Sequence, residues 1–166
     1  MGPEVLPATG EISVLVAAPP DRLWGFVSDP AIPARFSDEL QAARFAGGAR
    51  AERGAMIEGV NTRGTFTWTT TSTVVDFEPP TRFRWVTGDL EAPTATWTLE
   101  ALAVPGGSRL THTVVMHAGV APLAPAVEAE PERAAEIVGS RMAEVLANMT
   151  RTVEGIAALA EGRLGE

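Results

Sequence analysis

The order of the predicted secondary-structure elements indicates an α+β fold in which a curved sheet wraps around one long helix. Three observations lead to this prediction. Residues 17–30 read as the end of an apolar strand followed by a short amphipathic helix, strand-like segments rich in Thr and Trp come next, and residues 132–160 have a helical period. A sheet curved around a helix encloses space, so the same order also predicts an internal pocket.

The first elements are a predicted arm, a strand and a short helix. Residues 1–10 contain Gly and two Pro without periodicity, which indicates a flexible arm. Residues 11–17 alternate in polarity like a strand. Pro20 is tolerated in a first helical turn, Asp21 suits the positive end of the helix dipole, and Pro30 ends the helix.

A second helical turn and six further strands are expected before the long helix. Residues 32–36 would complete a two-helix elbow. The strands are predicted at about residues 40–46, 54–61, 65–77, 82–87, 94–104 and 108–117. The Ala- and Pro-rich residues 118–131 are expected to form a loop over one end of the sheet, and residues 11–162 to form a single domain.

Alternation along the strands predicts which side chains face the pocket. His112 shares its strand face with Leu110, Val114 and Met116 and is therefore expected to point inward. The same reasoning turns Phe83, Trp85 and Trp97 inward.

The longest strand is ambiguous in its phase. Phe66, Trp68 and Val74 share one face of that strand, whereas Phe77 lies on the other. A β-bulge near Val74-Val75 would place all of them on one side. In the preceding strand, Glu58 points into the pocket if its face is the inward one.

Composition removes several classes of chemistry. The chain has no Cys, no Tyr and no Lys, since all thirteen basic residues are Arg, so thiol, phenol and Schiff-base catalysis are excluded. Acid–base work would fall to His112, His117 or a carboxylate. The two histidines are expected on opposite strand faces and so cannot bind one metal ion together; no metal site is expected. No cofactor is expected either. The net charge of −8 argues against nucleic-acid binding, and no apolar run is long enough for membrane insertion.

Several segments together resemble the START-like, helix-grip superfamily (SRPBCC), and within it the polyketide cyclase/dehydrase and lipid-transport group. They are Pro19-Pro20-Asp21-Arg22-Leu23-Trp24-Gly25-Phe26-Val27-Ser28-Asp29-Pro30, Phe77-Glu78-Pro79-Pro80-Thr81-Arg82-Phe83, Ala95-Thr96-Trp97, and Gly106-Gly107-Ser108-Arg109-Leu110-Thr111-His112-Thr113. The resemblance covers about residues 10–160. It implies a seven-stranded antiparallel sheet that grips the C-terminal helix around a hydrophobic cavity, and it carries over no universal catalytic residue.

Three functions are compatible with these expectations. The leading one is binding of a small hydrophobic molecule, such as a polyketide, lipid or aromatic metabolite. The second is a cyclase- or dehydratase-like enzyme in which His112 acts as acid or base and Glu58 assists. The third is an interaction or regulatory module with a vestigial pocket. The predicted ligand-binding residues are Trp68, Trp85, Trp97, Phe83, Val114, Met116, Met142, Leu146 and Met149.

These side chains also have simpler interpretations. His112 also suits a neutral core position, and the tryptophans and methionines also suit core packing. The cluster of Glu58, Asn61 and Arg63 also suits a solvated strand end. The N-terminus lacks a secretory pattern, so a cytoplasmic location is expected. The sequence leaves open whether the protein is a monomer or a homodimer.

Overall fold

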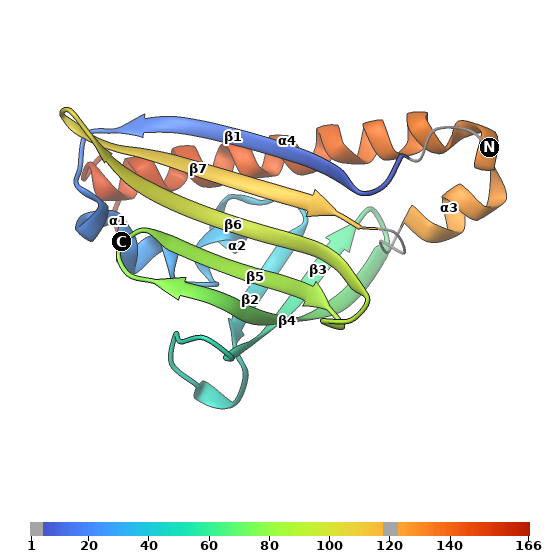
Figure 1. Cartoon of the computed structure of the whole chain (residues 1–166), viewed down its shortest axis with the longest axis horizontal. Helices are drawn as coiled ribbons and strands as arrows, with labels where there is room; N and C mark the ends of the chain where they lie inside the picture. Colours follow the sequence, from blue (N-terminus) through green and yellow to red (C-terminus); the bar gives the residue numbers. More distant parts are fainter. Residues whose placement is uncertain (1–4, 118–122) are drawn as a thin grey trace.

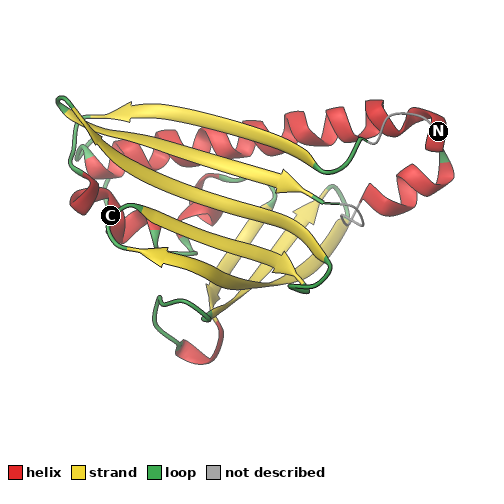
Figure 2. Cartoon of the chain, in the orientation of Figure 1, coloured by secondary structure: helices red, strands yellow, loops and turns green. Residues whose placement is uncertain are grey.

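A seven-stranded antiparallel sheet curves around one long helix in the computed structural model, which describes residues 5–117 and 123–166 (Figure 1). The strand order is β1-β7-β6-β5-β4-β3-β2, so β1 and β2 form the two edges. The strands are β1 (Ala8–Val16), β2 (Leu40–Phe45), β3 (Met56–Arg63), β4 (Phe66–Glu78), β5 (Arg82–Gly88), β6 (Pro93–Val104) and β7 (Gly107–Met116). Helix α4 (Ala134–Ala160) runs along one side of the curved sheet (Figure 2). The predicted α+β helix-grip fold is confirmed.

Two short helices form the predicted elbow between β1 and β2. Helix α1 (Pro20–Val27) begins with its proline in the first turn and carries Asp21 there. Helix α2 (Ile32–Phe36) follows after a short turn. Trp24 of α1 packs edge-on against Phe77 and Phe83, at centroid distances of 5.4 and 6.4 Å. The elbow is therefore anchored to the inner face of the sheet by aromatic contacts.

Two predicted segments differ from the structure by more than two residues. Strand β1 begins at Ala8, because Ala8 to Gly10 pair with β7, so the end of the predicted arm belongs to the sheet. Residues 1–4 lie outside the described part of the chain. In the predicted loop 118–131, residues 123–129 form helix α3 (Leu123–Ala129), while 118–122 are outside the described residues. The segment is rich in Ala, and its proline lies in the first turn, where no helical hydrogen bond is lost.

The predicted bulge in the longest strand is present. Val74 pairs with Trp85 and Asp76 with Arg84, which leaves Val75 as the extra residue. Val74 is buried, and Phe77 beyond the bulge packs against the same core. The bulge thus restores the inward phase that simple alternation would have lost.

The chain buries two apolar clusters beneath α4. The first cluster contains residues of the elbow and of the C-terminal half of α4. The second contains residues of the N-terminal half of α4, of α3 and of the ends of β6 and β7. Helix α4 packs mainly against β1, α2, α1 and α3, with fewer contacts to β7, which leaves the middle of the sheet farther from the helix. Among the helices of the described residues, none has the length and apolar character needed to cross a bilayer.

A candidate ligand cavity between the sheet and the long helix

A cavity of about 330 Å³ lies between the concave face of the sheet and α4. Both apolar clusters contribute to its wall, for example Phe83 and Leu99 from one and Ala95 and Met149 from the other. The elbow, the segment between α2 and β2, strands β2 to β7 and helix α4 supply the remaining residues. A volume of this size is within the range of small-molecule pockets.

One wall of the cavity is aromatic. Trp85 and Trp97 are cross-strand neighbours on β5 and β6, with ring centroids 6.3 Å apart and planes inclined by 12°. Phe83 extends this wall at 5.4 Å from Trp85, and the His112 ring lies about 6 Å from both tryptophans. Together these rings give the cavity an apolar, aromatic wall, the kind of lining that is typical of small-molecule pockets.

His112 lies on β7, facing the cavity as predicted, and is 3% exposed. Its Nδ1 is 2.9 Å from the carbonyl oxygen of Thr98. A carbonyl oxygen only accepts, so Nδ1 donates and carries the proton. Burial lowers the pKa of His112 to about 4, which outweighs the opposite effect of that hydrogen bond. At neutral pH the imidazole is therefore neutral, with Nε2 available as an acceptor.

The expectation that Glu58 faces the pocket is wrong. Strand β3 buries Ile57, Gly59 and Asn61, so Glu58 lies on the opposite, solvent-facing side. There its carboxylate pairs with Arg44 of the neighbouring strand at 3.2 Å. Asn61 is the member of the predicted polar cluster that reaches the cavity.

The predicted ligand-binding residues divide into two groups. Six of them line the cavity: Trp68, Trp85, Trp97, Phe83, Met116 and Met149. The other three, Val114, Met142 and Leu146, are placed elsewhere and belong to the second apolar cluster.

Close contact with β1 explains the positions of Met142 and Leu146. A Cβ atom built on Gly10 would lie 2.7 Å from Met142 Sδ and 2.9 Å from Leu146 Cδ2. The glycine thus lets the helix approach the edge strand closely, and the two side chains fill that contact. The expectation that they face the ligand is wrong because the helix presents a different stripe to the cavity.

The stripe of α4 that does face the cavity mixes polar and apolar residues. Its members are Arg141, Val145, Asn148, Met149 and Thr152. They recur at spacings of three and four residues, as expected for one helix face. The polar members were missed because the prediction followed only the apolar period.

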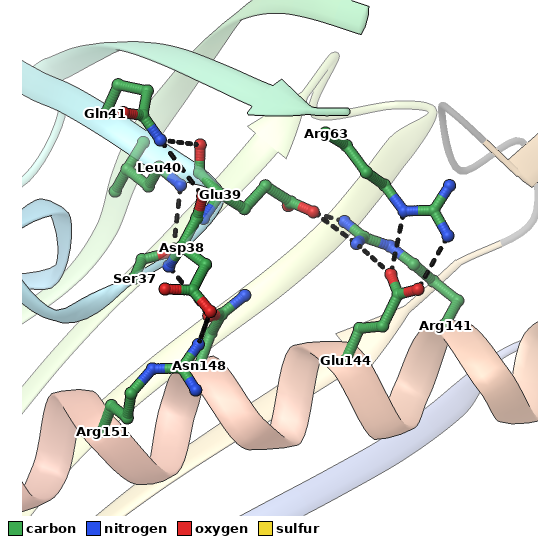
Figure 3. Close-up of polar contacts among 10 residues, drawn as sticks. All are labelled: Ser37, Asp38, Glu39, Leu40, Gln41, Arg63, Arg141, Glu144, Asn148 and Arg151. Carbon is green, nitrogen blue, oxygen red and sulfur yellow. Dashed lines mark hydrogen bonds and ion pairs between the residues drawn. The ribbon is translucent and has the colours of Figure 1, made fainter. Parts of the chain in front are cut away.

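Arg141 is itself buried and is the centre of an ionic cluster that extends outward to the exposed side chains of Glu144 and Arg63 (Figure 3). Its Nη1 and Nη2 donate to the two carboxylate oxygens of Glu39 at 2.5 and 2.7 Å. Nη1 also donates to Glu144 at 3.2 Å, and Glu144 in turn accepts two hydrogen bonds from Arg63 at 2.7 and 3.0 Å. Burial alone would lower the pKa of Arg141, but the contacts with Glu39 and Glu144 outweigh it and raise the pKa.

A second set of polar contacts holds the segment between α2 and β2 to α4 (Figure 3). Asn148 Oδ1 accepts from the Asp38 backbone N–H at 3.1 Å and also from Arg151. Arg151 donates further to Phe36 O at 3.0 Å and to the Asp38 carboxylate at 2.9 Å. Polar side chains therefore connect α4 to this segment where apolar helix packing ends.

The polar end could not have been located from sequence spacing. Arg141 and Glu39 are 102 positions apart, and each reads as an ordinary surface charge. The one available signal was Asn61, a polar residue in an otherwise strand-like segment. Within residues 5–117 and 123–166, no group of three or more His, Asp or Glu side chains is placed to hold a metal ion.

The helix-grip architecture, with a cavity between the sheet and the long helix, defines the structural class of the protein. The chain belongs to the polyketide cyclase/dehydrase and lipid transport family, whose model matches residues 7–154. A comparison with curated proteins found no match.

Solved structures of similar fold include single-domain and two-domain proteins. A Polyketide_cyc-like protein of Corynebacterium glutamicum is 21% identical, with a TM-score of 0.64 over 93% of this chain and 92% of that one. A protein of Rhodobacter sphaeroides is 23% identical, with a TM-score of 0.62 and 99% coverage of both chains. The di-domain ARO/CYC StfQ of the steffimycin biosynthetic pathway is 15% identical, with a TM-score of 0.73. That match covers 96% of this chain and 52% of StfQ, so the chain corresponds to about half of StfQ.

Proposed function

We propose that the protein binds a small hydrophobic molecule with a flat, aromatic part in the cavity beneath α4. The observation that carries this proposal is the aromatic wall, in which Trp85 and Trp97 lie nearly parallel beside the buried His112 ring. Met116 and Met149 add adaptable apolar surface on other walls. A planar ring system placed against these side chains would bury apolar area without leaving a charged group unpaired.

The neutral histidine adds a specific polar contact. Since Nδ1 donates to Thr98, Nε2 would accept a hydrogen bond from a ligand hydroxyl group. Its pKa of about 4 keeps it in this form throughout the neutral range. We therefore expect ligands that combine aromatic rings with hydroxyl groups, which includes aromatic polyketides.

Native mass spectrometry of the freshly purified protein tests this proposal. We expect a bound molecule of a few hundred daltons, on the order of what a pocket of this size holds. If the protein is first delipidated, we expect 2-ethylnaphthalene to quench its tryptophan fluorescence in a saturable manner. Protein that carries no molecule and does not bind the naphthalene probe would contradict the proposal.

A pair of matched variants shows whether binding occurs in this cavity. Thr70 lines the cavity, whereas Thr73 of the same strand has the opposite phase. Thr70→Phe fills the cavity and should abolish binding of 2-ethylnaphthalene. Thr73→Phe makes the same change on the outer face and should leave binding unchanged. Equal binding by the two variants would place the ligand elsewhere.

The second candidate function is an enzyme that transfers protons on the bound molecule, such as a cyclase or dehydratase. Supporting it is the position of His112, a neutral imidazole in the cavity wall. Glu58 has no part in this version because it faces solvent. His112→Gln should abolish turnover of a polyketide-like substrate while 2-ethylnaphthalene still binds. If the protein is only a carrier, neither the unmodified protein nor the His112→Gln variant will show turnover.

A further inference from the structure

Asn61 is a buried amide on the concave face of the sheet. Strand β3 turns its side chain inward, where the residue is 7% exposed and lines the cavity. Its cross-strand partner on β4 is Trp68, which lines the cavity as well. Residues paired directly across an antiparallel sheet point to the same side, so the amide and the indole ring belong to one part of the cavity wall.

This amide has very few hydrogen-bond partners within the protein. A side-chain amide offers two N–H donors and an oxygen that accepts. Among the described residues, its one side-chain contact runs from Nδ2 to Thr70 Oγ1 at 3.5 Å, which is longer than an ordinary N–H···O hydrogen bond. The oxygen, Oδ1, has no partner among these residues. Buried polar groups in folded proteins nearly always have one.

The Oδ1 atom of Asn61 is open to the cavity. Within residues 5–117 and 123–166, the only side-chain nitrogen or oxygen that is both unpartnered and sealed off from all open space is Arg141 Nε. Asn61 Oδ1 is unpartnered but is not such an atom, so it borders space that another molecule can enter. Since the side chain points to the concave face, that space is the cavity. The missing partner of Oδ1 therefore comes from what the cavity holds.

The same reasoning applies to His112 on β7. Its Nδ1 donates to Thr98, whereas its Nε2 has no partner among the described residues and is likewise not sealed off. Strands β4, β5 and β6 lie between β3 and β7 in the sheet, so the two acceptors lie on separate parts of the curved wall. A ligand that satisfies both acceptors needs hydrogen-bond donors at two separate positions.

We propose that Asn61 binds a hydroxyl group of the ligand, and that the cavity selects neutral aromatic molecules with hydroxyl groups at two separate positions. This inference rests on the proposed function, since it assigns a second polar group of the ligand that the cavity binds. A hydroxyl group donates to Oδ1 and also accepts from the amide N–H, so it suits Asn61 in both respects. A ketone, an ether or a carboxylate has no proton to donate to Oδ1 or to His112 Nε2.

Two naphthalenes of nearly the same shape measure the contribution of the hydroxyl groups at pH 7. One is 2,6-dihydroxynaphthalene, whose phenolic groups are uncharged at this pH. The other is 2,6-dimethylnaphthalene, which has methyl groups in their place. The dimethyl compound is the more hydrophobic, so the informative quantity is the ratio of the two dissociation constants, compared between variants. Isothermal titration calorimetry measures both constants.

The variant Asn61→Leu removes the amide and nearly keeps the shape of the side chain. The preference for the dihydroxy compound should fall about tenfold, the effect of one lost hydrogen bond, while the dimethyl compound still binds. Thr62→Val is the matched control, because Thr62 does not line the cavity and its hydroxyl group contacts Phe66 O and Thr67 Oγ1. It should leave the preference unchanged. An unchanged preference in Asn61→Leu, or an equal fall in both variants, would overturn the inference and leave the apolar cavity intact.

Thermal unfolding of the ligand-free protein separates this role from a structural one. An amide whose oxygen has no partner in the protein contributes little to folding, so Asn61→Leu should have the same Tm as the unmodified protein or a higher one. A clear fall in Tm, or failure of the variant to fold, would show that Asn61 supports the fold and would overturn the inference. Failure of the unmodified protein to bind either naphthalene would overturn the proposed function and the inference together.

Discussion

His112 is neutral at physiological pH because its ring is buried on β7, between the tryptophans and the core. Protonation would place a charge in an apolar environment, and the pKa falls to about 4 for this reason. The hydrogen bond to Thr98 then determines which nitrogen carries the proton. At neutral pH His112 is therefore a neutral ring whose Nε2 can accept a hydrogen bond, and not a charged acid.

The lowered pKa predicts a pH dependence of stability. Between about pH 6.5, where an unfolded histidine titrates, and about pH 4, the unfolded chain binds a proton at His112 that the folded protein does not. The stabilisation is fully present above the unfolded pKa and is lost as the pH falls toward the folded pKa. The free energy of unfolding should therefore fall by about 1.4 kcal/mol per pH unit in this window from His112 alone.

The variant His112→Gln isolates this contribution. Glutamine does not titrate, and its amide can still donate to the Thr98 carbonyl group. Urea unfolding at pH 7, 6 and 5 should give a steeper loss of stability for the unmodified protein than for the variant. Parallel pH profiles would show that His112 is not buried as a neutral ring.

Glu58 and Arg141 show how far single residues can be interpreted from sequence. Both are charged residues in amphipathic segments, and the prediction placed the wrong one in the cavity. Glu58 remained ambiguous because strand alternation gives two faces without saying which is inward. Arg141 could be buried only because Glu39, far away in the chain, accepts from both of its terminal nitrogens.

Helix α4 makes three different contacts with its successive faces. Met142 and Leu146 pack on β1 at Gly10, the stripe from Arg141 to Thr152 lines the cavity, and Gly155 meets Phe36 of α2. The apolar period showed that the helix is buried over much of its surface. It did not show which face meets which neighbour, because apolar residues occur on all of them.

Two glycines of α4 give a matched test of this packing. A Cβ atom at Gly155 would lie 2.4 Å from Phe36 Cζ, whereas one at Gly139 has no described atom within 4 Å. Gly139→Ala should stabilise the protein by up to about 1 kcal/mol through helix propensity. Gly155→Ala should instead destabilise it by about 1–3 kcal/mol because of overpacking. Thermal or urea unfolding measures both, and stabilisation by Gly155→Ala would contradict the close packing of α2 on α4.

In the molecule as a whole, α4 is held beside the cavity in two different ways. On one side, α4 packs against β1, β7, α1 and α2 through apolar contacts. On the other side, polar side chains of α4 reach the segment between α2 and β2, which leads to the opposite edge of the sheet (Figure 3). This arrangement keeps the helix away from the central strands and leaves room for a ligand.

The segment between α2 and β2 should separate from α4 more readily when one of its contacts with the helix is removed. Arg151→Gln loses the bonds to Phe36 O and to the Asp38 carboxylate. The amides of the segment from Ser37 to Leu40 should then exchange about tenfold faster, as expected for the loss of roughly one hydrogen bond. Hydrogen exchange followed by mass spectrometry measures this, and the amides of β6 and β7 should not change.

Arg133→Gln is the matched control for that experiment. Arg133 is the residue immediately before α4, and among the described residues its ion pairs are with Glu130 and Glu136, close to it in the chain. Its loss should leave exchange between Ser37 and Leu40 unaltered. The same acceleration in both variants would show that Arg151 does not hold this segment to α4.

The amino-acid sequence alone was sufficient for the architecture. Periodicity, prolines and turn residues are local signals, and they located every strand, the elbow, the long helix and the bulge beside Val75. The largest errors are at the start of β1 and in α3, where weak local signals compete. Strand alternation also brought the aromatic wall and His112 to the correct face.

Tertiary structure alone decided the polar end of the cavity and the orientation of α4. Glu39 and Arg141 interact across 102 positions, and a contact at this separation leaves no periodic trace in one sequence. The face that α4 turns to the cavity depends on where Gly10 and Gly155 allow close approach to β1 and α2. Helical periodicity is a property of one segment, whereas the rotation of a helix within the fold depends on all the surfaces that pack around it.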